Sequence, residues 1–288
     1  MIKRLCIIGV GLIGGSLARA LKAAGACGEV VGYGRNPEAL RRALELGVID
    51  RAESDIAAAA RGADVIVLGV PVGAMEAVLG ELKPHLEPQT ILTDVGSTKG
   101  SVVEAAKRVF GTLPPRFVPG HPIAGTEQSG VEASFAELYR QRRVILTPDA
   151  ATDREALETI RRMWQQTGAE VIEMPVAHHD EVLAATSHLP HLLAFTLVDT
   201  LARLEEHDDI FRFAAGGFRD FTRIASSNPQ MWHDICLNNR DALLKMLQRF
   251  STELGTLARA IEGGDSEAIL ATFQRAKSAR DAYCEKNC

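Results

Sequence analysis

The sequence lacks the cationic excess that contact with a polyanion requires. Its 32 Lys and Arg residues stand against 37 Asp and Glu, which gives a net charge of −5 over 288 residues. We therefore expect no nucleic-acid partner and no binding to an anionic membrane surface. No apolar stretch approaches the roughly 18 uncharged residues of a transmembrane helix. The N-terminal apolar run meets glycines too soon for a signal peptide.

Cysteine is also sparse. The five cysteines are scattered, odd in number and without Cys-x-x-Cys spacing; they are Cys6, Cys27, Cys236, Cys284 and Cys288. This pattern argues against a disulfide framework and against a zinc site. It predicts a protein of the reducing cytoplasm.

Short apolar runs alternate with amphipathic stretches over the first 175 residues. Strands are predicted at 4–9, 29–33, 63–70, 90–95, 143–147 and 170–174, and helices at 14–24 and 37–46. The run at 63–70 is almost continuously apolar, as in a strand that is covered on both faces. Strands that alternate with helices predict an α/β fold, a Rossmann-type doubly wound parallel sheet.

From residue 176 the pattern changes. Strand-like runs disappear, and long stretches with helical spacing follow, such as 189–204 and 241–261. We therefore predict two domains, an α/β domain at 1–175 and an all-helical domain at 176–288. No Gly/Ser-rich or Pro-rich linker separates them, so we expect a rigid interface, and ligand sites often lie in such clefts.

The strongest local signal is the turn GVGLIGGS, which starts at Gly9. It follows a predicted strand and opens a predicted helix, the context that a dinucleotide-binding turn requires. Gly9 would permit the tight turn, Gly11 the approach of a pyrophosphate, and Gly14 close packing of helix on strand. Leu12 and Ile13 lie at the helix N-terminus, whose free N–H groups favour phosphate. The alternative is a bare strand-to-helix turn.

The end of the second strand bears on the choice of cofactor. NAD-binding domains usually carry an Asp or Glu there, whereas an Arg accommodates the 2′-phosphate of NADP. This chain has no acid at that place, and Arg35 stands where the phosphate would lie. NADP is therefore favoured, and NAD is the alternative if Arg35 stacks on the adenine instead. Val70 and Pro71, at the end of the next apolar run, are further candidates for cofactor contact.

Two polar segments follow predicted strands. DVGSTKG, from Asp94, places Ser97 at the carboxyl end of a strand, the edge that holds ligands in open α/β sheets. Ser97 could orient a substrate hydroxyl or an imidazole, or cap the helix that begins near Lys99; spacing alone favours the cap. GHPIAGTE, from Gly120, places His121 on a constrained loop, where it is a candidate general base.

Histidines gather near the predicted domain boundary. Five of the eight lie there: His121, His178, His179, His188 and His191. A zinc site would need a carboxylate in an H-E-x-x-H pattern or a partner cysteine, and neither is present, so binding of a substrate anion is favoured. Further along, Arg219 and Arg223 stand among phenylalanines. They could clamp a carboxylate or form a surface ion pair with Asp220.

Together, these motifs resemble the prephenate/arogenate (cyclohexadienyl) dehydrogenase family of tyrosine biosynthesis, part of aromatic amino acid biosynthesis. The resemblance rests on an ordered set: GVGLIGGS (9–16), DVGSTKG (94–100), GHPIAGTEQSG (120–130), HHD…SHLPH (178–191) and GFRDFTRIASSNPQMW (217–232). It implies an NAD(P)-dependent oxidoreductase that converts prephenate to 4-hydroxyphenylpyruvate by oxidative decarboxylation. It also implies a helical domain that builds a homodimer.

The resemblance implies roles for single residues as well. His121 matches the catalytic histidine that accepts the hydrogen bond and then the proton of the ring hydroxyl. Ser97 matches the serine that positions this histidine, Arg223 an arginine that holds a substrate carboxylate, and His191 a histidine near the substrate side chain. The other positions that match residues supporting or lining the site are Glu127, His179, Asp180, His188, Asp220 and Trp232. On this basis Ser97 is catalytic rather than a cap.

Alternatives stay open. Arogenate differs from prephenate by an amino group in place of a keto group, and we favour prephenate or acceptance of both. Another two-domain hydroxyacid dehydrogenase would need a catalytic lysine in the helical half, and the lysines there lie in no such motif. A non-enzymatic sensor of NADPH would need neither His121 nor Arg223.

Overall fold

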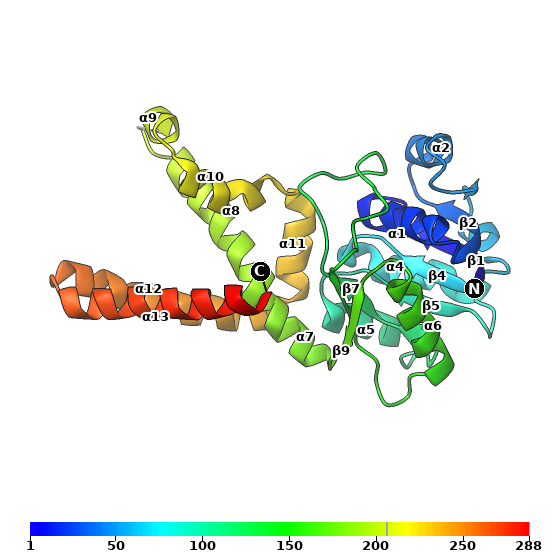
Figure 1. Ribbon diagram of the computed structural model, residues 1–288. Helices are drawn as coiled ribbons and strands as arrows, with labels where there is room; N and C mark the ends of the chain where they lie inside the picture. The colour runs from blue at the N-terminus through cyan, green and yellow to red at the C-terminus, as the bar shows by residue number, and fades with distance from the viewer. Residues whose placement is uncertain (206, 288) are drawn as a thin grey trace. The chain divides into compact units, whose positions relative to one another are not determined.

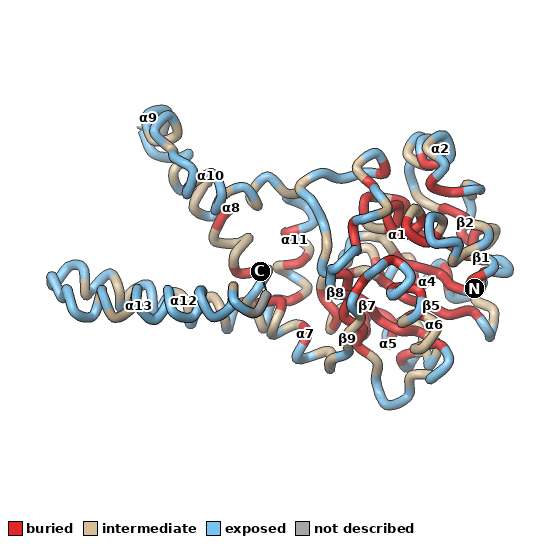
Figure 2. The backbone as a smooth tube through the Cα atoms, in the orientation of Figure 1, coloured by how far each residue is buried: buried red, intermediate tan, exposed pale blue. Residues whose placement is uncertain are grey.

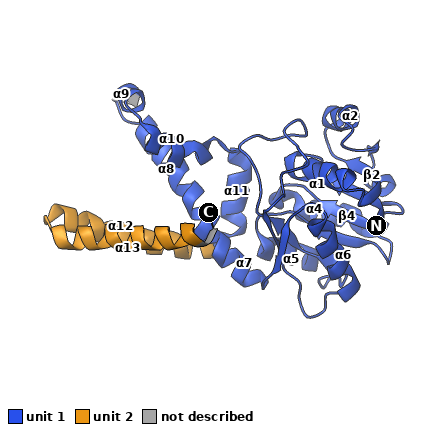
Figure 3. Cartoon of the chain, viewed as in Figure 1, with its two compact units in different colours: residues 1–240 blue, residues 241–288 orange. Residues whose placement is uncertain are grey.

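The computed structural model describes residues 1–205 and 207–287 (Figure 1). The chain forms two compact units, residues 1–240 and 241–288 (Figure 3).

A six-stranded parallel sheet organises the first unit. Its order is β3-β2-β1-β4-β5-β6. The strands are β1 (Ile2–Ile8), β2 (Cys27–Tyr33), β3 (Arg51–Glu53), β4 (Val65–Leu68), β5 (Ile91–Asp94) and β6 (Phe117–Val118). β1 pairs with both β2 and β4, so the direction of winding reverses there, and ligands of such sheets bind at the carboxyl ends of the strands beside this reversal. The predicted α/β doubly wound fold is confirmed.

Helices cover both faces of this sheet (Figure 2). α1 (Leu12–Ala23), α2 (Pro37–Glu45) and α6 (Arg154–Gln165) pack on one face. α3 (Ile56–Ala60), α4 (Met75–Leu82) and α5 (Lys99–Phe110) pack on the other, with short turns η1 (Val72–Ala74) and η2 (Lys83–His85) around α4. Successive β1 residues enter opposite cores, Leu5 and Ile7 on one face and Cys6 and Ile8 on the other, and this is why the run 5–8 is continuously apolar.

A second, three-stranded sheet adjoins the first. β7 (Gly120–Pro122) pairs antiparallel with β8 (Arg143–Leu146), and β8 pairs parallel with β9 (Glu170–Glu173). The expectation that the runs at 143–147 and 170–174 continue the parallel sheet is wrong. Pro119, between β6 and β7, has no N–H to donate to a strand ladder, and the chain passes from the first sheet to the second at this residue.

Beyond Glu173 the described residues hold no strand. The first unit continues through α7 (Val176–Leu183), a π-helical turn η3 (Ala184–His188), α8 (Leu189–Ala202), α9 (His207–Arg212), α10 (Gly216–Thr222), η4 (Arg223–Ser226) and α11 (Pro229–Asn238). α7 packs on α5 and α11 packs on η1, so these helices belong to the compact unit of the sheet. The predicted domain boundary at 175/176 coincides with the end of the last strand. It remains a prediction, because the compact unit of the sheet extends to residue 240.

The run Val176–Ala202 is long and apolar enough to cross a membrane by length and composition alone. Core helices of soluble proteins have the same length and composition. The run also carries His179, Asp180 and His188, which make hydrogen bonds within the first unit.

The second unit consists of α12 (Arg240–Glu262) and α13 (Ser266–Asn287), joined by a turn at Gly263 and Gly264. Gly264 has φ of +66°, the left-handed conformation that ends many helices. Large apolar side chains on both helices are exposed, among them Leu254, Ile261, Leu270 and Phe273.

Candidate active site

The glycine-rich turn leaves room for a dinucleotide. Gly9 has φ of +98°, and a Cβ there would lie 2.5 Å from the Gly69 carbonyl oxygen. A Cβ on Gly14 would lie 2.6 Å from the Gly9 oxygen, whereas a Cβ on Gly11 would meet nothing within 4 Å. The first turn of α1 has no side-chain cap and no acidic residue. This open cradle at a helix N-terminus fits a pyrophosphate, and Leu12 and Ile13 provide its first helical N–H groups.

The end of β2 carries no carboxylate. Arg35 is exposed and, within 1–205 and 207–287, forms no hydrogen bond or ion pair. Its neighbour Asn36 caps α2 by accepting from the Glu38 and Ala39 N–H groups. Val70 and Pro71 follow β4 at the same edge of the sheet as the glycine-rich turn.

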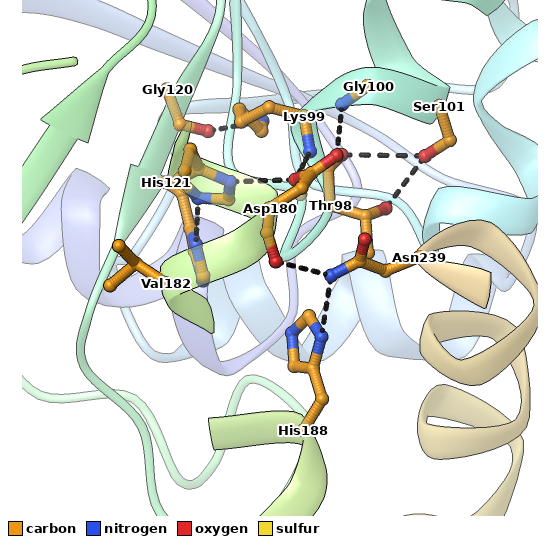
Figure 4. Close-up of polar contacts among 12 residues, drawn as sticks. Thr98, Lys99, Gly100, Ser101, Gly120, His121, Asp180, Val182, His188 and Asn239 are labelled. Carbon is orange, nitrogen blue, oxygen red and sulfur yellow. Dashed lines mark hydrogen bonds and ion pairs between the residues drawn. The ribbon is translucent and has the colours of Figure 1, made fainter. Parts of the chain in front are cut away.

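His121 lies on β7 and is only 8% exposed. Its Nδ1 is 2.9 Å from Nε2 of His179, and Nδ1 of His179 is 2.8 Å from Oδ1 of Asp180. The Asp180 carboxylate in turn accepts from the backbone N–H groups of Lys99 and Gly100, each at 2.8 Å (Figure 4). The chain of contacts therefore runs from the N-terminus of α5 to the ring of His121.

A buried ion pair fixes the loop that carries His121. The side chains of Lys99 and Asp94 are both fully buried and form a short charge-assisted contact. The Lys99 ammonium also donates to the Gly120 carbonyl at 2.6 Å, and Asp94 accepts from the Gly120 and Gly96 N–H groups. The residue before His121 is therefore held through both of its backbone polar groups.

A second histidine group lies on the helical side. Asn239 donates to the Asp180 carbonyl at 2.8 Å and lies 3.0 Å from Nδ1 of His188 (Figure 4). His188 is 1% exposed, and its Nε2 has no partner among the residues described. The ring of His191 stacks on Trp232 with centroids 3.6 Å apart, and Nε1 of Trp232 is likewise buried without a described partner.

These imidazoles are held neutral. Burial lowers the pKa of His121 well below 6.5, and electrostatic interactions with His179, Lys99 and His188 lower it further. Burial also lowers the pKa of His179, although Asp180 opposes this effect, and it lowers the pKa of His188 to about 4. At neutral pH each of these rings has one protonated and one unprotonated nitrogen.

Ser97 does not cap α5. The N-cap residue is Thr98, whose hydroxyl contacts the Ser101 hydroxyl and makes no capping hydrogen bond to the helix backbone. The Asp180 carboxylate accepts from the first N–H groups of the helix instead. The capping interpretation from spacing was therefore wrong. Ser97 is half-buried, and its hydroxyl bonds to nothing else in the described part of the chain.

The arginine that sequence analysis singled out pairs with a distant acid. Arg223 contacts the Glu127 carboxylate, while its side chain remains 64% exposed. Asp220 is exposed and forms no ion pair with a described residue, so the alternative of a surface pair between Asp220 and Arg219 or Arg223 is wrong. Within residues 1–205 and 207–287, no hydrogen bond or ion pair joins the Arg223–Glu127 pair to the histidine network.

Sequence reasoning missed Asn239, Asp94 and Lys99. Lys99 and Asp94 stood in a recognised motif, but nothing in their spacing shows that both are buried. Asn239 carried no signal at all, since its partners lie 59 and 51 residues away. The described residues contain no group of three or more His, Cys, Asp or Glu side chains arranged to hold a metal ion.

Fold and site define a dehydrogenase that uses a pyridine nucleotide: a doubly wound sheet with a phosphate cradle, and a buried neutral histidine at the same edge. Residues 17–173 match the model of the prephenate dehydrogenase nucleotide-binding domain, and residues 175–275 match that of the prephenate dehydrogenase dimerization domain. The chain belongs to the prephenate dehydrogenase family.

Relatives support this assignment. The cyclohexadienyl dehydrogenase of Zymomonas mobilis is 42% identical over 96% of this chain and 95% of that protein. The prephenate dehydrogenase of Bacillus subtilis is 40% identical over 96% of this chain and 75% of that protein. Prephenate dehydrogenase from Aquifex aeolicus, solved with hydroxyphenyl propionate and NAD+, superposes with a TM-score of 0.91 at 38% identity, covering 98% of this chain and 99% of that chain. Synechocystis arogenate dehydrogenase superposes with a TM-score of 0.80 at 30% identity, and the match covers 97% of this chain and 99% of that chain.

Proposed function

We propose that this chain catalyses the oxidative decarboxylation of prephenate to 4-hydroxyphenylpyruvate, with His121 as the general base. The observation that carries the proposal is the state of His121. Its Nδ1 is engaged by His179, whereas its Nε2 bonds to no described residue. A neutral imidazole with one free nitrogen is the group that can accept a hydroxyl proton at neutral pH.

Each residue of the site is proposed to have a separate role in this reaction. The nicotinamide supplies the hydride acceptor. His121 accepts the hydrogen bond and then the proton of the ring hydroxyl, so that electron density on the oxygen favours departure of the hydride from the same carbon. The C–C bond to the ring carboxylate breaks as CO2 leaves, and its electron pair completes the aromatic ring. The proton on His121 then returns to the ring oxygen, which gives the phenol of 4-hydroxyphenylpyruvate. Ser97, on the loop after β5, is proposed to position the hydroxyl and His121 from the cofactor side.

Arg223 is proposed to hold a substrate carboxylate. An exposed guanidinium offers a bidentate charge-assisted contact. His191, stacked on Trp232, and His188, whose Nε2–H is buried without a described partner, are proposed to line the pocket around the ring and side chain. His179 and Asp180 have their polar atoms engaged behind His121, so we assign them no direct contact with substrate. Asp220 is exposed, and nothing in the structure gives it a role.

Glu127 favours acceptance of arogenate as a second substrate. Arogenate carries an ammonium where prephenate carries a keto group, and the Glu127 carboxylate lies directly on Arg223. The pair therefore offers a cation for the side-chain carboxylate and an anion for the ammonium. The expected activity is that of a cyclohexadienyl dehydrogenase that prefers prephenate.

NADP is the proposed preferred cofactor. Arg35 is exposed and without a described partner at the end of β2, and no acid is present there to receive a ribose 2′-hydroxyl. The Arg35→Asp variant should weaken NADP binding far more than NAD binding, as measured by titration calorimetry, with Arg41→Asp on α2 as the control. Equal losses for the two cofactors would instead show that Arg35 stacks on the adenine.

We further propose a cytoplasmic homodimer formed through the helical residues 176–288. The match to the dimerization domain and the exposed apolar side chains of α12 and α13 support this. Light scattering on the purified protein should give twice the chain mass.

The proposal is tested by product analysis. Purified protein incubated with prephenate and NADP+ should form 4-hydroxyphenylpyruvate, CO2 and reduced nicotinamide in equal amounts, and the His121→Asn variant should form them far more slowly. Reduced nicotinamide without CO2 would show a different dehydrogenase reaction, and the proposal would then fail.

A further inference from the structure

The polar side-chain atoms of Asp180 and His179 are bonded within the protein, which leaves none of them for a substrate. The His179 side chain is 0% exposed, and both of its ring nitrogens already have partners. Asp180 has its carboxylate on the first N–H groups of α5. Their positions therefore suggest that they act on His121 rather than on a ligand.

The Asp180 carboxylate determines which atom donates in each hydrogen bond between Asp180, His179 and His121. Two backbone N–H groups point at the Asp180 carboxylate, and both must find an acceptor. Burial alone would raise the pKa of Asp180, but hydrogen bonds from His179 and from these N–H groups lower it below its usual value. An ionised carboxylate only accepts, so Nδ1 of His179 must carry a proton and donate to it.

The same reasoning then fixes the next ring. A neutral imidazole carries one N–H, so with Nδ1 of His179 protonated its Nε2 is an acceptor. Nδ1 of His121 lies 2.9 Å from that acceptor and must be the donor. His121 therefore has its proton on Nδ1, and its Nε2 presents a lone pair. In an imidazole without such partners, both tautomers are populated.

We propose that Asp180 and His179 are positioning residues that hold the proton of His121 on Nδ1 and so keep Nε2 available as the base. This inference rests on the proposed role of His121. It assigns the pair a function in tautomer selection, anchored on the N-terminus of α5. When Nε2 takes up a proton, the Nδ1–H of the resulting imidazolium donates toward His179, and the Asp180 carboxylate lies in line to stabilise the charge.

Three variants separate this role from simple packing. His179→Leu removes the acceptor, so kcat with prephenate should fall by about 10- to 100-fold, the usual cost of losing a residue that orients an active group. His179→Gln restores a carbonyl oxygen that can accept from Nδ1 of His121, and it should recover part of the loss. His178→Leu is the matched control: His178 is the exposed neighbour on the same helix, and its loss should leave kcat unchanged.

A double variant gives the sharpest kinetic result. If His179 acts through His121, adding His179→Leu to His121→Asn should cost nothing further, because the base is already absent. A merely structural role would lower kcat by the same factor in both backgrounds, and this outcome would overturn the proposal.

Nitrogen NMR of 15N-histidine-labelled protein tests the tautomer without any substrate. The His121 resonances are identified by their loss in His121→Asn. We expect a protonated Nδ1 and an unprotonated Nε2 in the unmodified protein, and a mixture of tautomers in His179→Leu. A protonated Nε2 in the unmodified protein would refute the inference even if prephenate is turned over. Conversely, the expected spectrum in a protein that does not oxidise prephenate would reject only the proposed function.

Discussion

His188 should make the stability of the protein depend on pH. The ring is 1% exposed, and burial lowers its pKa from 6.5 to about 4. Below about pH 6.5 the unfolded chain therefore binds a proton at His188 that the folded protein does not bind. The contribution of His188 to the free energy of unfolding is complete above that pH and is lost as the pH falls toward about 4. The full difference corresponds to about 3 kcal/mol, and about 2 kcal/mol of it is already lost at about pH 5.

The test is urea unfolding followed by tryptophan fluorescence at about pH 7.5 and about pH 5. The His188→Gln variant keeps an oxygen that can accept from Asn239 but cannot be protonated in this range, so its loss of stability on acidification should be about 2 kcal/mol smaller than that of the parent protein. His85→Gln, at an exposed histidine, serves as the control and should match the parent. If His188→Gln loses as much stability on acidification as the parent protein does, protonation of His188 is not the cause of the loss.

Substitutions at three further positions test other parts of the site. His121→Asn should lower kcat about 10²- to 10⁴-fold while the Kd for the dinucleotide, measured by calorimetry, stays the same, and an unchanged kcat would show that His121 is not the base. Arg223→Ala should raise KM for prephenate with a smaller effect on kcat, and Arg223→Lys should recover part of the affinity; initial-rate kinetics that show only a kcat effect would contradict carboxylate binding. Lys99→Met leaves the buried Asp94 without its cation and should cost about 3–5 kcal/mol in chemical unfolding, whereas a loss below about 1 kcal/mol would mean that the pair is not buried as described.

Elements that a local sequence pattern specifies could be predicted from the sequence. The apolar runs that became β1, β2, β4 and β5 are buried on both faces, so periodicity found them, and the glycine-rich turn was identified from its place between a strand and a helix. β3, β6 and β7 have only three, two and three residues, too few for a pattern to emerge. Their absence from the prediction also hid the second sheet, because β7 is the strand that starts it.

The residues of the candidate site were predicted, but most of the hydrogen bonds that join them were not. Family resemblance named His121, His179, Asp180 and His188, but not how they are joined. The contact of Asp180 with the first turn of α5 spans 81 residues of chain, and local spacing instead assigned the cap to Ser97. The geometry also separates residues that the resemblance grouped together, since His179 and Asp180 stand behind the base while Arg223 is exposed on another element.

An assay of nicotinamide reduction shows whether this site oxidises a cyclohexadienyl substrate with a pyridine nucleotide. Prephenate and arogenate are each combined with NAD+ and with NADP+. We expect reduction with prephenate, faster with NADP+ than with NAD+, and slower but measurable reduction with arogenate. If folded protein gave no reduction in any of the four combinations, the protein would not be a cyclohexadienyl dehydrogenase.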